Sequence, residues 1–395
     1  MEANIKKEYL FISFYNLDLT RGIWMIYLAM RGFSLIELGM LESSFHITSF
    51  LMEIPTGAVA DLWSRKASRI LGRVFYLSSL FILFLATGFA FQLLGFVLCA
   101  IGYNLESGAG EALLYDSLDM KTRESRYMKI LGIKEFIIQA SSILALLVGG
   151  FLATRGYDLV FALSITVVIL SLLTAFSFRE PIVHQEIKSI EGLHWIKKLK
   201  KQTLESLKVV KSRRQIAFYL IFSELIFSFT VSLFFYLQNY WKNIGFSEFH
   251  IGAVFAGASL LSGLTSLFAQ KIEQKMGGER KLILILPLFL LMSLWGIALS
   301  PWKFPFYLVI GFMEGLLLVA ISHYINRLIP QEYRATVLSF QSMIFSFFMI
   351  ALFPLIGWLG ETFSLNTAFL IMAITGSLIS VFYYSFRIMT KEKNS

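Results

Sequence analysis

Five charged residues lie within long apolar stretches of the sequence. Asp18 and Arg21 interrupt the first stretch, and Glu106, Glu224 and Glu314 interrupt three later ones. A charge inside a bilayer is costly, so such residues usually face a cavity or an oppositely charged partner. Carboxyl groups in a poorly hydrated cavity are suited to carry a proton. These residues therefore predict a proton- or cation-binding site, and the alternative is an ion pair with Arg21 that only holds helices together.

The elements that position these charges are helices long enough to cross a bilayer. The 395 residues are 56% hydrophobic and 15% charged, which excludes an ordinary soluble chain. A transmembrane helix needs about 20 apolar residues, and each candidate is too long for a barrel strand. The predicted fold class is thus an all-α polytopic membrane protein with twelve spans: 9–30, 35–60, 70–90, 91–118, 130–153, 159–178, 216–240, 251–269, 282–299, 304–325, 335–359 and 366–386.

The basic residues indicate how the chain is oriented. Of the 35 Lys and Arg, 30 fall in segments that share one side of the membrane; the exceptions are Arg21, Arg31, Arg155, Lys242 and Lys303. The positive-inside rule then places both termini and a central linker in the cytoplasm. The linker, residues 179–214, has apolar residues at helical spacing beside a lysine cluster, which predicts a basic interfacial helix. It divides the chain into two six-helix bundles, residues 1–178 and 215–395.

The two bundles resemble each other in sequence. Gly-Phe-Ser opens the second stretch at residues 32–34 and the eighth at residues 245–247. An arginine precedes both the fifth and the eleventh stretch, at an offset that also relates Glu106 to Glu314. Internal duplication of this kind is typical of transporters whose site lies between the repeats. Glu106 and Glu314 are therefore predicted to be pseudo-symmetric partners.

The loop after the second stretch resembles a known signature. Its sequence, GAVADLWSRK at residues 57–66, has a Gly, an Asp four positions on and then a basic pair, and it is similar to the signature loop of the major facilitator superfamily. Leu62 and Ser64 depart from the family pattern. The resemblance implies a major facilitator fold and a bacterial inner-membrane transporter whose two bundles expose one site alternately.

Physically, this loop would serve as a latch between conformations. Asp61 would sit against the positive end of a helix in the other bundle, and Arg65 would pair with Asp116 at the end of the fourth stretch. The predicted gating latch consists of Gly57, Asp61, Arg65, Lys66 and Asp116. The basic residues that follow, Arg69 and Arg73, are expected only to set topology.

Spans one, four, seven and ten line the cavity in this family. In this sequence the same four spans carry the intramembrane charges: Asp18, Arg21, Glu106, Glu224 and Glu314. Spans three, six, nine and twelve, which would face lipid, carry no interior charge. The cavity is therefore expected to be acid-rich, which favours a cationic substrate. The predicted proton-coupling residues are Asp18, Glu106, Glu224 and Glu314, and the predicted substrate contacts are Arg21, Tyr103, Asn104, Glu111 and Gln238.

The direction of transport stays open at the level of sequence. The segments 53–57 and 111–116 are similar to a bacterial drug-efflux-like branch, which favours proton-coupled efflux by antiport of small cationic or amphipathic compounds. Against this, Asn104 stands where the fourth span often has arginine, and the fifth span lacks the Gly-Pro pair of efflux proteins. The alternative is therefore uptake of a nutrient or metabolite by proton symport, followed by a membrane enzyme or sensor built on the same fold.

Other functional classes lack their sequence signals. No HExxH motif and no phosphate-binding loop occurs, so an enzyme, a metal and a cofactor are not expected. Cys99 is the only cysteine, which excludes an intrachain disulfide. The expected partners are a small-molecule substrate, protons and the lipid bilayer, with no nucleic acid, and the protein is expected to act as a monomer.

Overall fold

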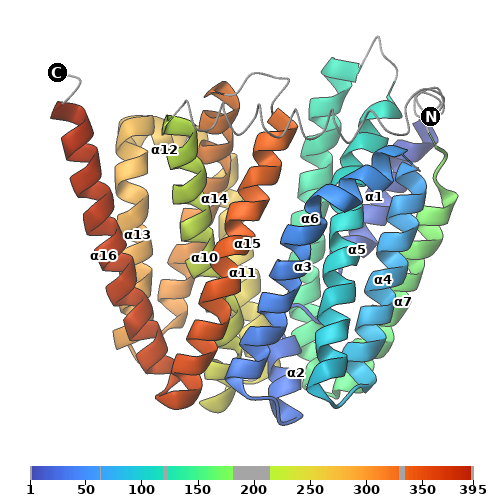
Figure 1. The fold of residues 1–395 in the computed structure, drawn as a ribbon, viewed down its shortest axis with the longest axis horizontal. Coiled ribbons are helices and arrows are strands. Elements are labelled where there is room, and N and C mark those ends of the chain that lie inside the picture. The colour runs from blue at the N-terminus through green and yellow to red at the C-terminus, as the bar shows by residue number, and fades with distance from the viewer. Residues whose placement is uncertain (1, 63, 119–122, 181–213, 329–333, 393–395) are drawn as a thin grey trace.

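The computed structural model describes residues 2–62, 64–118, 123–180, 214–328 and 334–392, and these residues form helices and no strands. The first group of helices is α1 (Glu2–Asn16), α2 (Trp24–Met30), α3 (Leu35–Leu62), α4 (Arg65–Leu85), α5 (Phe89–Asp116), α6 (Arg123–Ala153) and α7 (Tyr157–Ser177). The second group is α10 (Arg214–Asn243), α11 (Glu248–Leu267), α12 (Ala269–Met276), α13 (Glu279–Leu299), α14 (Phe304–Leu328), α15 (Arg334–Thr362) and α16 (Leu365–Glu392). The two groups stand side by side in Figure 1.

Ten of the described helices are long and apolar enough to cross a membrane. They correspond to the third to twelfth predicted spans. The second span is α3, which carries Glu37, Glu42 and Glu53, and the first span is divided between α1 and α2. The predicted twelve-span, all-α fold is thereby confirmed, whereas the short helix α12 was not predicted. The linker predicted at 179–214 lies almost wholly outside the described residues.

The break in the first span is centred on Asp18. Its Oδ1 atom accepts hydrogen bonds from the backbone N–H of Thr20 at 3.0 Å and from the Thr20 hydroxyl at 2.7 Å. Aspartate commonly satisfies the following backbone in this way, in competition with a continuous helix. Residues 17–23 therefore form a turn between α1 and α2, and this turn carries both Asp18 and Arg21.

Helices α4 and α5 approach each other through a pair of glycines. A Cβ on Gly72 would lie 2.9 Å from the carbonyl of Gly102, and one on Gly102 would lie 2.7 Å from the carbonyl of Gly72. No other residue type permits this separation. Arg69 lies about one turn before Gly72 and Arg73 directly follows it, so the close approach brings both arginines to the level of Glu106 on α5.

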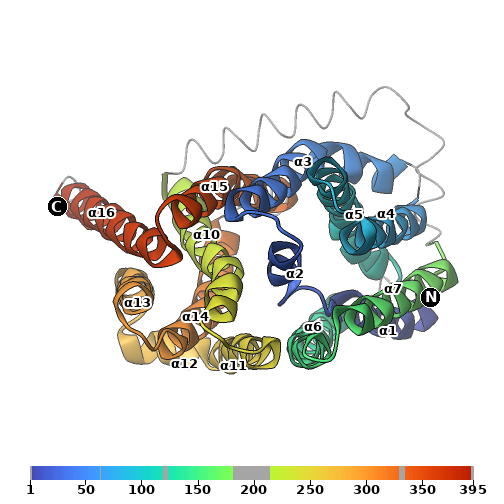
Figure 2. The same ribbon diagram turned by 90° about the horizontal axis from the view of Figure 1, so that it is seen from below.

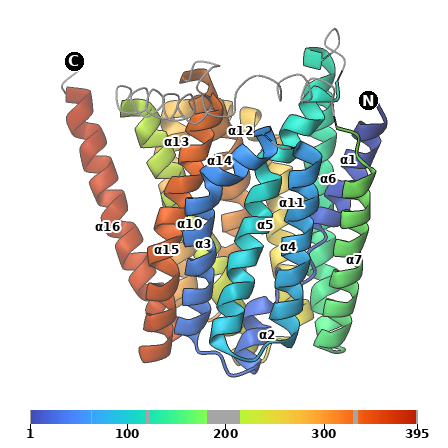
Figure 3. The same ribbon diagram turned by 45° about the vertical axis from the view of Figure 1, so that its right-hand side comes forward.

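The two groups of helices touch along α3 with α15 and along α6 with α11, as Figure 2 shows. The Ser43 hydroxyl donates to the carbonyl of Ile350 at 2.9 Å, and Glu361 accepts a hydrogen bond from the backbone N–H of Leu35 at 2.9 Å. These contacts lie toward the end of the molecule away from the N- and C-termini (Figures 1 and 3). The described interface between the groups is therefore closed at that end.

Candidate functional site

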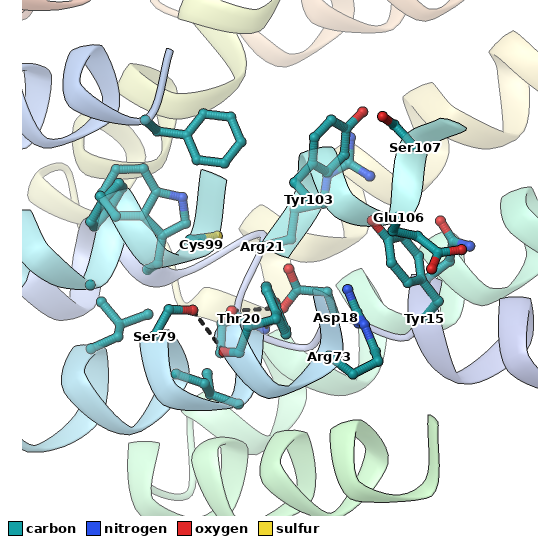
Figure 4. Close-up of a pocket in the computed structure, with 18 of the residues that line it drawn as sticks. Tyr15, Asp18, Thr20, Arg21, Arg73, Ser79, Cys99, Tyr103, Glu106 and Ser107 are labelled. Atoms are coloured by element: carbon teal, nitrogen blue, oxygen red, sulfur yellow. Dashed lines mark hydrogen bonds between the residues drawn. The ribbon is translucent and has the colours of Figure 1, made fainter. Parts of the chain in front are cut away.

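A cavity of about 590 Å³ lies among the helices of the first group and is shown in Figure 4. The turn between α1 and α2 supplies Asp18 and Arg21, α4 supplies Arg73, and α5 supplies Glu106. Its apolar wall includes Phe96, Phe235 of α10, and Trp24, whose ring lies 5.0 Å from Phe96 and 5.4 Å from Phe235. The size is typical of small-molecule sites, and charged groups meet aromatic ones as in such sites.

Glu106 belongs to a buried ion-pair network centred on Arg69. Arg69 Nε lies 3.1 Å from Glu106 Oε2 and its Nη2 lies 2.8 Å from Glu106 Oε1. On the other side, Arg69 Nη1 lies 2.5 Å from Oε2 of Glu8 on α1. The Arg69 and Glu8 side chains are fully buried. The Arg69 guanidinium therefore pairs with two carboxylates. Of the two, only the Glu106 carboxylate lines the cavity.

The rings of α1 and the end of α7 hold Arg69 in place. Its guanidinium lies 4.0 Å from the ring centre of Phe11 and 4.6 Å from that of Phe178. Cation–π contacts in a desolvated setting contribute about 2 kcal/mol or more. The network thus joins α1, α4, α5 and the chain just after α7 at one buried point.

Arg73, one turn further along α4, has different surroundings. Its guanidinium lies 4.0 Å from the ring centre of Tyr15 and 4.8 Å from that of Tyr76, and the side chain lines the cavity. The residue is only 2% exposed. No carboxylate of the described residues pairs with it, and its Nε atom has no hydrogen-bond partner there.

These two arginines correct the sequence prediction in two respects. Helix α4 begins at Arg65, capped by Ser64, rather than at residue 70, so Arg69 and Arg73 lie inside the bundle and not in a topology-setting loop. The third span therefore carries interior charge on a face that lines the cavity. The acid-rich cavity that the sequence predicts has a smaller excess of acid than expected, because its lining holds four acids and three cations: Asp18, Glu42, Glu106 and Glu111 against Arg21, Arg73 and Lys134.

The predicted substrate contacts divide into two sets. Arg21, Tyr103 and Glu111 line the cavity together with Asp18. Asn104 does not, since its amide group donates to the Ser49 carbonyl at 2.7 Å and accepts from the Ser49 hydroxyl at 2.7 Å. Asn104 thus holds α5 against α3.

Gln238 also lies outside the cavity lining, although it contacts the turn that supplies Arg21. Its side-chain amide donates to the Arg21 carbonyl at 3.3 Å, and its Oε1 atom is buried without a partner in the described part of the chain. The Arg21 guanidinium lies 5.7 Å from the ring centre of Phe234 on α10. Arg21 and Gln238 therefore connect the first group of helices to α10.

The two acidic residues predicted in the second group lie apart from this cavity. Glu224 is buried on α10 and accepts hydrogen bonds from Gln341 of α15 at 2.6 Å and from Ser223 at 2.9 Å. Glu314 on α14 lies near the Thr230 hydroxyl of α10. Both carboxylates face neutral hydrogen-bond donors, so neither is held by an ion pair of the kind that holds Glu106.

The predicted latch is present in part. Arg65 and Asp116 form an ion pair, and Arg65 also donates to the Ala112 carbonyl at 2.6 Å. The carboxylate of Glu180 accepts the backbone N–H groups of Arg65 and Lys66 at 3.0 and 2.9 Å, and so caps α4. Gly57 has open space at its Cβ position, and the Asp61 side chain lies outside the described part of the chain.

Another ion pair, which sequence reasoning missed, lies near the closed end. Glu248 at the start of α11 pairs with Lys242 at 2.6 Å and accepts a hydrogen bond from Tyr157 of α7 at 2.9 Å. It thereby joins the two groups of helices. Within the described residues, no cluster of His, Cys, Asp or Glu is arranged to hold a metal ion.

Comparison with known proteins gives a consistent result. A family model described as Major Facilitator Superfamily matches residues 9–310 and 241–395. A curated relative from Bacillus subtilis (strain 168), named as an uncharacterized MFS-type transporter YxaM, is 23% identical over 382 residues, which are 91% of this chain and 92% of the relative. The crystal structure of the nucleoside transporter NupG superposes with a TM-score of 0.75 at 15% identity, covering 98% of each chain. That of a D-xylose-proton symporter superposes with a TM-score of 0.67 at 15% identity, covering 96% of this chain and 95% of the other.

Proposed function

Because this chain belongs to the Major Facilitator Superfamily and is a membrane transporter rather than an enzyme, we propose that it is a proton-coupled secondary transporter of a small organic solute. The solute binds in the cavity of the first group of helices, and the coupling proton binds at the Glu8–Arg69–Glu106 network. The observation that carries this proposal is the sharing of one buried guanidinium by two buried carboxylates.

The charges of the network support proton binding there. Two ionised carboxylates and one guanidinium leave an excess of one negative charge at a point removed from water, which is costly. One proton held between Glu8 and Glu106 removes that excess. Glu106 lines the cavity and Glu8 does not. Occupation of the cavity therefore acts on one member of the pair, which is how solute and proton binding become coupled.

The contacts between the two groups of helices support alternating access. In this conformation the groups meet through α3 with α15 and α6 with α11 at the end away from the termini. The Arg65–Asp116 pair lies toward the opposite end. With the termini in the cytoplasm, as the basic residues predict, the cavity opens inward in this state.

The direction of transport has two candidates. The similarity of residues 53–57 and 111–116 to a drug-efflux-like branch favours efflux by antiport. The missing Gly-Pro pair and the Ser49–Asn104 contact, where that position often has arginine, favour uptake by symport. A lining with both signs of charge no longer favours a cationic solute over a neutral or anionic one.

The test uses the full-length protein in proteoliposomes with an imposed pH gradient and a pH-sensitive dye inside. Cationic drugs, amino acids, sugars and organic acids are screened for solute-dependent proton movement, whose sign distinguishes antiport from symport. Glu106→Gln and Glu8→Gln are expected to abolish coupled proton movement while solute binding persists. Glu135→Gln, which changes an exposed carboxylate of α6 outside both the network and the cavity lining, is the matched control. Normal coupling in both network variants overturns the assigned site and directs attention to Asp18, Glu224 and Glu314.

A further inference from the structure

Arg73 is a buried cation that the protein itself leaves without an anion. The residue is 2% exposed, and in the described parts of the chain it donates no hydrogen bond and pairs with no carboxylate. The rings of Tyr15 and Tyr76 flank its guanidinium at 4.0 and 4.8 Å, so the group is held in position. Figure 4 shows Arg73 on the cavity wall, beside Asp18 and near Tyr15.

The acidic residues near Arg73 already have other hydrogen-bond or ion-pair partners. Both carboxylate oxygens of Glu106 lie within 3.1 Å of Arg69 nitrogens. Asp18 accepts two hydrogen bonds from Thr20. Their charges lower the cost of burying Arg73, but neither supplies the direct partner that buried charges normally have.

A buried guanidinium without a partner is a ready anion site. Its planar set of N–H donors matches a carboxylate in two parallel hydrogen bonds. Since Asp18 and Glu106 lie nearby, a group with a single negative charge fits better than a doubly charged phosphate, which they would repel. The aromatic part of the wall, formed by Trp24, Phe96 and Phe235, suits an apolar or aromatic body.

We propose that the transported solute is an organic monocarboxylate and that Arg73 binds its carboxylate group, with the apolar part of the solute against Trp24, Phe96 and Phe235. The proposal rests on the proposed function, because it names the solute class of the same cavity. It replaces the cationic substrate that the intramembrane acids predicted.

Binding is measured by calorimetry on the purified full-length protein with three probes that share one ring system. These are 2-naphthoate, its neutral amide 2-naphthamide and the cation 2-naphthylmethylammonium. The carboxylate is expected to bind at least about tenfold more tightly than the amide, as a charged hydrogen-bonded pair would give. The cation is expected to bind most weakly.

Substitutions test whether Arg73 is the residue that causes the preference for naphthoate over naphthamide. Arg73→Gln is expected to equalise binding of naphthoate and naphthamide, and Arg73→Lys to keep a smaller preference because the charge remains. Arg155→Gln, which removes an exposed arginine stacked on Phe151, is the matched control and is expected to behave as the unmodified protein. Even where a variant at Arg73 fails to fold, the comparison of the three probes on the unmodified protein tests the preference for a carboxylate.

Equal binding of naphthoate and naphthamide by the unmodified protein, or tightest binding of the ammonium probe, overturns the proposal. So does a carboxylate preference that survives in folded Arg73→Gln protein. Proton-coupled flux of a non-carboxylate solute in proteoliposomes refutes the carboxylate assignment and leaves the proposed transport function intact. Absence of coupled flux for every solute refutes the transport function, whatever the calorimetry gives.

Discussion

Arg69 and Arg73 are one turn apart on α4 and have opposite environments. Arg69 has two carboxylates and two aromatic rings around it, and every direct partner belongs to the protein. Arg73 has two tyrosine rings and an open cavity. A buried charge in the first setting holds helices together through its ion pairs, whereas one in the second has space beside it for a ligand.

Gly110 offers a test of the network that leaves all three charges in place. A Cβ at this position would lie 2.7 Å from Glu106 Oε1 and 3.4 Å from Arg69 Nη2. We expect Gly110→Ala to push the Glu106 carboxylate away from the guanidinium and to cost about 1–3 kcal/mol of stability. Solute-dependent proton movement should fall with it, measured with the internal pH dye, while the thermal unfolding midpoint in detergent reports the stability.

The same helix provides the control for that substitution. A Cβ at Gly108, two positions away on α5, would meet nothing within 4 Å. Gly108→Ala should therefore leave coupling unchanged and should slightly stabilise the helix, since alanine is the better helix former by about 1 kcal/mol. Equal effects of the two substitutions would show that helix flexibility, and not the Glu106–Arg69 contact, limits coupling.

Sequence reasoning identified part of the site, Arg21 included, and missed Glu8 and the two arginines of α4. Asp18, Glu106, Tyr103 and Glu111 line the cavity, and all were found because polar groups in apolar stretches are conspicuous. Glu8 and the two α4 arginines were missed because they lie at the ends of their apolar stretches, where charge is also expected from the membrane boundary. Hydropathy does not show which way a side chain points. A helical wheel of residues 65–85, begun at the Ser64 cap, would have placed Arg69 and Arg73 on nearly one face.

At the scale of elements, α6 and α11 meet through glycines near the closed end. A Cβ on Gly252 would lie 2.3 Å from the carbonyl of Leu146, and one on Gly150 would lie 2.6 Å from the carbonyl of Glu248. Such contacts between small residues let helix backbones approach in a bilayer, where van der Waals packing drives association. The closed end therefore depends on positions that tolerate no side chain.

We expect Gly252→Ala to separate α6 from α11 and to shift the protein toward states open at this end. Backbone hydrogen exchange at the start of α11 should rise, because its hydrogen bonds lose the cover of α6. Gly263→Ala is the control, since a Cβ there would meet nothing within 4 Å on the same helix. Unchanged exchange in folded Gly252→Ala protein would mean that the helices adjust without opening.

At the scale of the whole molecule, the structure shows one conformation, in which the two groups of helices meet at the closed end. Alternating access requires a second conformation in which the two groups separate at that end. The hydrogen bond from Ser43 to the Ile350 carbonyl, at 2.9 Å, brings α3 and α15 together across the two groups. In a Cys99→Ser background, the pair Ser43→Cys and Ile350→Cys should cross-link on oxidation. Flux should then stop, and reduction should restore it.

The cross-linked protein should still bind its solute, because the cavity lies within the first group of helices and keeps its lining. Each single cysteine variant serves as the control for oxidation itself. Undiminished flux through fully cross-linked protein would show that α3 and α15 stay together during transport, and the alternating-access proposal would then fail for this interface.

The overall architecture was the most predictable level. The twelve apolar stretches correspond to helices of the structure, apart from the division of the first span at Asp18 and the added α12. The conformational state was not predictable. Two states of a transporter use the same apolar stretches, and their difference lies in contacts such as that of Leu35 with Glu361, which no local pattern encodes.

Cys99 lines the cavity and is the only cysteine in the chain. The unmodified protein therefore carries a single chemical tag beside its transport site. A small alkylating reagent that reaches this thiol from water must pass through the space that a solute would fill, so a bound solute slows the modification. Mass spectrometry of one peptide then reports occupancy in native membranes, without a fluorescent label, a radioactive substrate or an engineered residue.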